Sequence, residues 1–256
     1  RFEKMSILRY NNLIFSYYHE ASKGQAFPVR ISYLTWRKDP CRKMTIWAVL
    51  PVKRYAVGKS RLRSLFSEAE IAQLNRQLFE STFTKIREIP EIDHVLVISR
   101  EDLALDWCRS HGGTALMEDS PSSLNLAVTK AQGYVSEHGG GCFLVLPSDL
   151  PLMTPQDISR LIEQMDGKRR LVIVPDHLQS GTNALLMSDP ELIKPRFGTD
   201  SFRKHTRQAL AKNAELVVYL NQNIQWDLDT SLELNRIINN QPEISILSQL
   251  RKETSS

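Results

Sequence analysis

The sequence is poor in long apolar runs and in cysteine, and both absences exclude classes of protein. No apolar run among the 256 residues approaches the ~20 residues of a transmembrane helix, so no membrane span is predicted. The three cysteines, Cys41, Cys108 and Cys142, lie far apart and form no CxxC pair. This spacing argues against a disulfide framework and against a zinc site, and it is typical of proteins from the reducing cytoplasm.

The body of the chain also lacks an excess of positive charge, although the whole sequence has a formal net charge of +4. Residues 1–43 hold nine Lys or Arg and three Asp or Glu, whereas residues 44–256 hold 24 and 26. The body therefore offers no electrostatic case for nucleic-acid binding. Residues 1–43 also lack the apolar core and cleavage site of a secretory signal. We expect an N-terminal extension outside the fold at 1–43, one domain at 44–240 and a polar tail at 241–256.

Strand-like and helix-like segments alternate from Met44 onward. Short apolar strands are predicted at 45–53, 94–99, 114–118, 142–147, 170–176, 182–188 and 215–221. Helices are predicted at 67–89, at 101–111, within 120–138, from 154, at 200–213 and at 231–240. Ser67 with Glu70, and Thr154 with Pro155, mark two helix starts. This alternation predicts a single doubly wound, Rossmann-like α/β domain with a mostly parallel sheet, whose ligands bind at the carboxyl ends of the strands.

The turn after the first strand lacks both common phosphate-binding motifs, GxxxxGK[ST] and GxGxxG. It nevertheless holds four cations in nine positions, Lys53, Arg54, Lys59 and Arg61, around the single glycine Gly58. Mobile cations and loop amides of this kind suit a triphosphate. A solvated charged loop is the alternative interpretation.

Three aspartates follow predicted strands. Asp149 lies between two prolines after the 142–147 strand, and Asp227 and Asp229 lie near the C-terminus in an extended segment whose alternate residues share one side. Hard oxygen ligands suit Mg²⁺, which takes one or two from protein and the others from phosphate and water. Each aspartate could instead cap a following helix, although Thr154 is better placed than Asp149 for that role. The pattern leaves metal ligand and helix cap both open.

Polar turns precede two further elements. SGTNALL at 180–186 and PRFGTDSFRKH at 195–205 place small polar residues at a strand start and at a helix start, where a helix N-terminus favours anions. A helix capped by Asp200 or Ser201 is the alternative. Asn125 either bonds at a helix start or contacts nucleobase or ribose. His205 receives no acid–base role, because a lone histidine in a helix is more often structural.

The order of several motifs resembles the 2-phospho-L-lactate guanylyltransferase family. The motifs are PVK…GKSRL, SLNLAV, LVLPSDLPLMTP, VPD…SGTNALL, FGTDSFRKH and WDLDT, which together run from about Met44 to Leu234. The resemblance implies a GT-A-like fold of the nucleotide-diphospho-sugar transferase type and a step in coenzyme F-420 biosynthesis. In that step GTP and a phosphorylated three-carbon acid (2-phospho-L-lactate, phosphoenolpyruvate or 3-phosphoglycerate) give a guanylylated diphosphate diester and pyrophosphate.

The resemblance also implies roles for individual residues. Asp149 would bind Mg²⁺ together with Asp229 or Asp227, and the catalytic set would be Lys53, Lys59, Arg61 and Asp149. The implied nucleotide contacts are Pro51, Lys53, Lys59, Ser60, Arg61 and Asn125. The implied contacts to the acid substrate are Thr182, Asn183, Gly198 and Ser201.

The implied reaction accounts for the lack of a nucleophilic His or Cys arrangement in this sequence. The attacking phosphate oxygen is already ionised near neutral pH, because its second pKa is about 6, so no general base is needed. No nucleophilic His or Cys arrangement is therefore expected. The implied partners are GTP and a small phospho-acid, without nucleic acid or membrane, and the sequence is compatible with a homodimer.

Two other functions compete with this one. A molybdenum-cofactor or sugar-phosphate nucleotidyltransferase of the same fold usually carries a GGxSxRMG-type first loop, whereas this loop holds one glycine. The second alternative is a non-catalytic nucleotide-binding protein, and only the carboxylates and the basic loop argue against it. A pyrophosphate-release assay separates all three.

Overall fold

The computed structural model describes residues 29–32, 44–120, 123–166, 169–229 and 233–234. The strands are β1 (Val29–Ser32), β2 (Ile46–Val52), β3 (His94–Ser99), β4 (Thr114–Met117), β5 (Cys142–Val145), β6 (Arg170–Pro175), β7 (Thr182–Met187) and β8 (Glu215–Tyr219). The helices are the 3-10 turn η1 (Ser60–Leu62), α2 (Glu68–Arg87), α3 (Asp102–Ser110), α4 (Leu124–Glu137), α5 (Pro155–Ile162), α6 (Ser201–Ala211) and α7 (Gln222–Gln225). Among these residues, no helix has both the length and the apolarity to cross a membrane.

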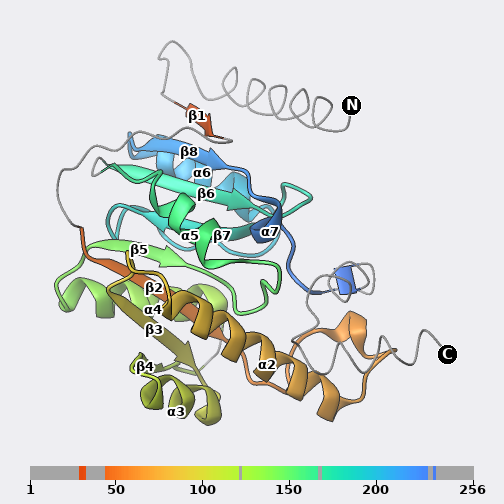
Figure 1. Ribbon diagram of the computed structural model, residues 1–256. Coiled ribbons are helices and arrows are strands. Elements are labelled where there is room, and N and C mark those ends of the chain that lie inside the picture. Colours follow the sequence, from red (N-terminus) through yellow and green to blue (C-terminus); the bar gives the residue numbers. More distant parts are fainter. Residues whose placement is uncertain (1–28, 33–43, 121–122, 167–168, 230–232, 235–256) are drawn as a thin grey trace.

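One eight-stranded sheet forms the middle layer, in the order β1-β8-β6-β7-β5-β2-β3-β4 (Figure 1). β7 runs antiparallel to β5 and β6, and the other pairings among the described strands are parallel. The reversal has a local cause, because the connection from β6 to β7 is a short turn at 176–181, too short for the crossover that a parallel pair needs. The prediction of a single, mostly parallel α/β sheet is confirmed.

Helices cover both faces of the sheet. α2, α3 and α5 pack on one face, and α4 and α6 pack on the opposite face (Figure 1). Because strand side chains alternate, Ala48 and Leu50 of β2 belong to the first core, and Trp47 and Val49 belong to the second. Burial on both faces explains why the strands are continuously apolar in sequence.

The two predicted helix starts are present. Ser67 and Glu70 form a capping box at α2, and the Ser67 N–H donates to the Glu70 carboxylate at 2.7 Å. Thr154 caps α5 in the same way together with Asp157, and Pro155 is the first helical residue. A Ser or Thr cap typically stabilises a helix by ~1 kcal/mol. Since Thr154 holds the capping position, Asp149 is left for another role.

The structure also departs from the prediction at both ends of the domain. Val29–Ser32 pairs in parallel with β8, so the prediction that 1–43 lies outside the fold does not hold for these four residues. The short helix α7 was not predicted. The helix predicted at 231–240 and the tail at 241–256 lie outside the described residues, apart from 233–234.

Candidate active site

A cavity of about 570 Å³ opens at the carboxyl ends of β2, β3 and β5. The antiparallel β7 begins at the same edge and contributes its first residue, Thr182. The charged side chains on the cavity wall are four cations (Lys53, Arg54, Lys59 and Arg100) and three carboxylates (Glu118, Asp149 and Asp229). Both signs of charge therefore meet where an α/β sheet usually binds its ligand.

The basic loop after β2 is a folded turn. Val57 donates its N–H to the Arg54 carbonyl at 2.8 Å, and Gly58 and Lys59 follow with φ angles of 106° and 47°. A positive φ is uncommon for a lysine, and the preceding glycine adopts it without steric cost. The turn leaves the Lys59 residue only 8% exposed, whereas Lys53 and Arg54 stay exposed at the cavity.

Tyr55 anchors this loop to the helices beside it. Its backbone N–H donates to the Glu101 carboxylate at 2.9 Å, and its carbonyl accepts from the Asn75 amide at 2.8 Å. Burial, and then the charges of Glu80 and Glu101, raise the pKa of the Tyr55 hydroxyl, so that the ring stays neutral. The loop that carries Lys53 and Lys59 is thus tied to α2 and to the start of α3.

The turn that carries Asp149 is held by backbone groups on both of its sides. From α2, Thr82 donates to the Ser148 carbonyl at 3.3 Å and Lys85 donates to the Pro151 carbonyl at 3.0 Å. From the C-terminal segment, the Leu228 N–H donates to the Asp149 carbonyl at 3.2 Å. These bonds leave the Asp149 carboxylate to face the cavity.

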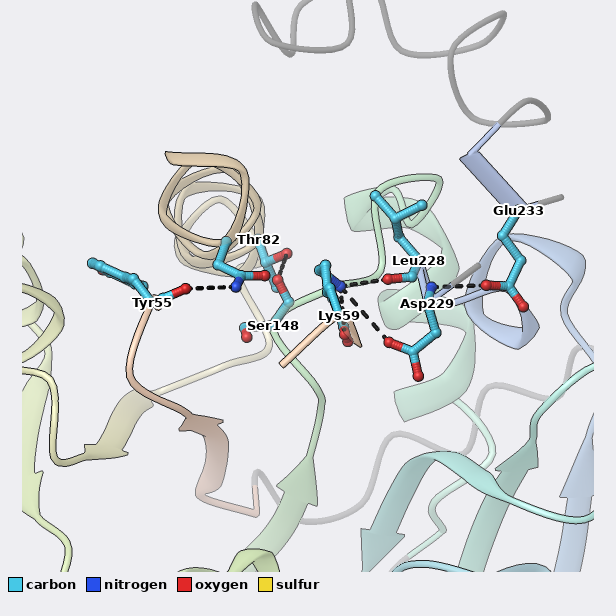
Figure 2. A network of polar contacts seen from close by, with 9 residues as sticks. Tyr55, Lys59, Thr82, Ser148, Leu228, Asp229 and Glu233 are labelled. Atoms are coloured by element: carbon cyan, nitrogen blue, oxygen red, sulfur yellow. Dashed lines mark hydrogen bonds and ion pairs between the residues drawn. The ribbon is translucent and has the colours of Figure 1, made fainter. Parts of the chain in front are cut away.

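Lys59 joins the two aspartates of the cavity. Figure 2 shows Lys59 between the Leu228 carbonyl and Asp229. Its ammonium nitrogen lies 3.1 Å from Asp149 Oδ2 and 3.9 Å from Asp229 Oδ1, and it also donates to the Leu228 carbonyl. Burial, and then the charge of Asp149, raise the pKa of Asp229, while Lys59 acts in the opposite direction. Two hard carboxylates therefore converge on one cation, and carboxylate oxygens are the type of ligand that Mg²⁺ takes from a protein.

Asp227 belongs to a neighbouring group. Its carboxylate, the His177 ring and the Glu233 carboxylate each offer a ligand atom within 4.8 Å of the others. The His177 ring stacks on Trp226 with centroids 4.1 Å apart. Burial, and then the charges of Asp149 and Asp229, raise the pKa of Asp227 to about 7. Of the two candidates, Asp229 shares Lys59 with Asp149, whereas Asp227 is not among the described residues that line the cavity.

Polar residues surround Thr182, another residue of the cavity lining. The Ser201 hydroxyl lies 3.1 Å from Thr182 Oγ1, and His205 Nδ1 lies 3.1 Å from the same oxygen. Thr182 and Phe197 line the cavity, while Ser201 is buried behind them. The structure thus brings two of the four predicted acid-substrate residues, Thr182 and Ser201, into direct contact.

Two of the residues predicted to contact ligand make hydrogen bonds within the protein. Asn125 Oδ1 accepts from the Phe197 N–H at 2.7 Å, and its Nδ2 donates to the Phe197 carbonyl at 3.2 Å. Asn183 is buried and donates to the Ile224 carbonyl at 3.0 Å. Neither is among the described residues that line this cavity. Asn125 positions Phe197, Asn183 ties β7 to α7, and contact of either side chain with a ligand stays a prediction.

The remaining predicted residues divide into two groups. Pro51 and Lys53 line the cavity, as expected of nucleotide contacts. Arg61 and Gly198 are exposed and lie outside the described lining, and the Ser60 side chain is outside what the structure describes. Gly198 has φ +104° and no atom within 4 Å of an added Cβ. A side chain would therefore have room at this position, and it is the positive φ that favours glycine.

Several lining residues were missed by the sequence reasoning. Arg100 and Glu118 come directly after β3 and β4, so a strict search of every strand end would have found them. Asn75 lies on α2, where no local pattern marks it, and Phe197 lies in the 195–205 turn, where only the smaller polar residues were singled out. Their place on the wall depends on packing between distant segments.

Comparison with known proteins was made by sequence and by structure. Residues 46–252 match the family described as "Guanylyl transferase CofC like". The phosphoenolpyruvate guanylyltransferase of Rubrobacter xylanophilus is 33% identical over 76% of this chain and 94% of its own length. The 2-phospho-L-lactate guanylyltransferase of Methanothermobacter thermautotrophicus is 28% identical over 76% and 85%.

Solved structures extend the likeness to the fold. A candidate nucleotide-diphospho-sugar transferase from Desulfovibrio desulfuricans superposes with a TM-score of 0.64 at 15% identity, covering 82% of this chain and 95% of its own. A nucleotidyl transferase from Methanothermobacter thermautotrophicus gives 0.56 at 13% identity, covering 75% and 95%. These similarities show that the chain has the predicted nucleotidyltransferase fold.

Proposed function

This chain belongs to the CofC-like guanylyl transferase family and is a nucleotidyltransferase, and on this premise we propose that it transfers GMP from GTP to a phosphorylated three-carbon acid. The reaction releases pyrophosphate and serves coenzyme F-420 biosynthesis. One observation carries the proposal. A cavity at the strand ends is lined by four cations and by two carboxylates, Asp149 and Asp229, that converge on one of these cations, Lys59.

The cations suit a triphosphate. Lys53, Arg54 and Arg100 line the cavity together with Lys59. Cations placed around the phosphates stabilise the charge that develops on the α-phosphate and on the leaving pyrophosphate. The attacking group is a phosphate oxygen that is already ionised near neutral pH. The proposed reaction therefore needs no side chain to act as a general base.

The carboxylates suit Mg²⁺. Asp149 and Asp229 supply hard oxygens that already converge on one cationic nitrogen, so they fit the ion as its protein ligands. When bound, Mg²⁺ would neutralise phosphate charge and hold the phosphates in one geometry. Asp227 lies next to this pair with His177 and Glu233, and we assign it no role in the reaction.

The acid would bind at Thr182 and Phe197, which line the same cavity. Phosphoenolpyruvate is the first acid to test, because the relative from Rubrobacter xylanophilus is named for it and is more similar to this chain than the phospholactate enzyme cited above. The cysteine pattern supports a cytoplasmic location, and a homodimer stays a prediction.

Pyrophosphate release tests the function. Purified protein is assayed with GTP or ATP, with phosphoenolpyruvate, 2-phospho-L-lactate or 3-phosphoglycerate, and with or without Mg²⁺. We expect release that needs GTP, Mg²⁺ and one of the acids. Asp149→Asn should lower turnover by at least about a hundredfold, the scale typical for loss of an electrostatic catalytic group. Asp119→Asn, which removes an exposed carboxylate paired with Lys130, is the matched control and should leave turnover unchanged.

Release with a sugar phosphate or a molybdopterin but with no phospho-acid would reject this assignment in favour of the related transferases. Wild-type turnover by Asp149→Asn would reject the metal assignment while leaving the reaction intact.

A further inference from the structure

A buried chain of hydrogen bonds connects His205 of α6 to the cavity wall. The His205 ring is 0% exposed, and each of its nitrogens has one partner. Nε2 lies 2.9 Å from the backbone nitrogen of Arg196, and Nδ1 lies 3.1 Å from Thr182 Oγ1. The Phe197 ring meets the imidazole edge-on at 4.9 Å. The imidazole is therefore fixed in place on all of these sides.

The partner of Nε2 determines where the ring carries its proton. The Arg196 backbone N–H can only donate, so Nε2 must accept and cannot itself be protonated. Burial, and then the charge of Lys204, lower the pKa of His205 to about 4, which agrees with a neutral ring at neutral pH. A neutral imidazole has one N–H, and here it must be on Nδ1. Nδ1 then donates to Thr182 Oγ1.

This tautomer determines where the hydroxyl hydrogen of Thr182 points. Thr182 and Ser201 carry two hydroxyl hydrogens between them, and one of these joins the two oxygens at 3.1 Å. Because His205 donates to Thr182, it cannot take the second hydrogen. Ser201 is only 1% exposed, whereas Thr182 lines the cavity, so the second hydrogen points from Thr182 into the cavity. The opposite tautomer would accept that hydrogen and remove the donor.

We propose that His205 is a positioning residue that keeps the Thr182 hydroxyl as a hydrogen-bond donor toward an anionic oxygen of the acid substrate. The identity of that substrate rests on the proposed function, whereas the tautomer does not. A donor that is oriented before the ligand arrives needs no reorganisation when the ligand binds. The same donor would repel a cation and would favour a carboxylate or phosphate oxygen.

Two substitutions test the hydrogen bonds of the two His205 ring nitrogens separately. In His205→Asn the side-chain amide can overlay Nδ1 and donate to Thr182, but it leaves the Arg196 N–H without its acceptor. In His205→Gln the amide oxygen can overlay Nε2 and accept from Arg196, but the donor to Thr182 is lost. We expect His205→Gln to raise KM for the acid roughly ten- to hundredfold, the value of a hydrogen bond to a charged group. His205→Asn should keep the wild-type KM for the acid, and both variants should keep the wild-type KM for GTP.

The tautomer itself is measured without any turnover. Nitrogen-15 correlation spectra of the full chain at neutral pH should show the His205 ring with its proton on Nδ1 and a bare Nε2, and the ring signals are assigned through the couplings that connect them to the His205 backbone. A proton on Nε2, or a doubly protonated ring, would overturn the proposal even if no variant folds. An unchanged acid KM in a folded His205→Gln, or equal rises in both variants, would also overturn it. If the wild-type protein lacks turnover, the proposed function fails, and the spectrum still decides the tautomer.

Discussion

At the scale of single residues, Lys59 occupies the space in which the two cavity aspartates meet. Its Nζ is 3.1 Å from Asp149 and 3.9 Å from Asp229, and its side chain is only 4% exposed. In the proposed reaction a divalent ion would use the same two carboxylates, and an ammonium group cannot share that space with it. The flexible four-carbon stem of lysine allows the ammonium to shift toward a bound triphosphate. Lys59 thus stabilises the carboxylate pair when no metal ion is bound.

Replacing Lys59 by methionine tests this interpretation. Lys59→Met leaves two neighbouring carboxylates without their shared cation, so the free energy of unfolding should fall by about 1–3 kcal/mol at neutral pH. Mg²⁺ can take the vacated position, so it should raise the melting temperature of the variant more than that of the wild type. Thermal unfolding with EDTA or MgCl₂, in the absence of nucleotide, measures both effects.

Lys53→Met is the matched control, because it removes an exposed cation from the same loop. An identical response to Mg²⁺ in Lys59→Met and the wild type would show that Lys59 does not compete for the carboxylates.

At the scale of elements, α7 connects the sheet to the segment that carries Asp229. Asp157, in the first turn of α5, accepts hydrogen bonds from the Asn221 and Asn223 amides at 2.8 and 3.0 Å. Burial opposes ionisation of Asp157, but the bonds from Asn221, Thr154 and Asn223 outweigh it and hold its pKa below the usual range. One carboxylate therefore caps α5 and also holds the start of α7.

Asp157→Asn should weaken this connection in a pH-dependent manner. Because the folded-state pKa is lowered, the wild-type carboxylate contributes stability above its unfolded pKa and loses it as the pH falls through the folded value. The variant should be less stable than the wild type by about 1–3 kcal/mol at pH 7, the range for hydrogen bonds to charged groups. Urea unfolding from neutral pH down to acid should show this difference shrinking.

Asp106→Asn breaks an exposed pair with Arg109 at 2.8 Å and is expected to change little at any pH. If the difference in free energy of unfolding between Asp157→Asn and the wild type stayed constant down to strong acid, the ionised form of Asp157 would not be the source of that difference.

At the scale of the whole molecule, strand order separates the cavity from the N-terminal edge of the sheet. The cavity lies at β2, β3, β5 and β7, whereas β1 pairs only with β8 among the described strands. Three strands, β8, β6 and β7, stand between β1 and β5 (Figure 1). β1 covers an edge of the sheet that would otherwise present unpaired backbone groups.

Removal of residues 1–43 should therefore affect stability and solubility rather than turnover. A chain that starts at Met44 keeps every described residue of the cavity lining and loses β1, which leaves the β8 edge without its described partner. We expect unchanged kcat and KM, a lower melting temperature and more aggregation on heating. Steady-state kinetics and light scattering of the full and shortened chains measure these effects. A large loss of kcat in a folded, shortened chain would contradict the independence of cavity and edge.

Much of the fold and about half of the site could be predicted because the signals are local. Apolar runs, capping residues and strand ends are visible within a few positions, and they located β2, β5, α2, α5 and Asp149. What the sequence did not reveal are bonds between segments that are distant in sequence. Asn125 and Phe197 are 72 positions apart, and Asn183 and Ile224 are 41 apart. An amide that fixes a distant backbone looks the same in sequence as an amide that binds a ligand.

The sequence by itself determined the α/β layering, the basic loop, the aspartate between two prolines and the family resemblance, because each depends on neighbouring residues. Only the tertiary structure decided that Asp229 rather than Asp227 joins Asp149 at Lys59, and that His205 faces Thr182. Asp227 and Asp229 lie two positions apart on an extended segment, so alternation alone placed them on one side. Their partners come from other elements, and the positions of those elements follow from packing across the whole sheet.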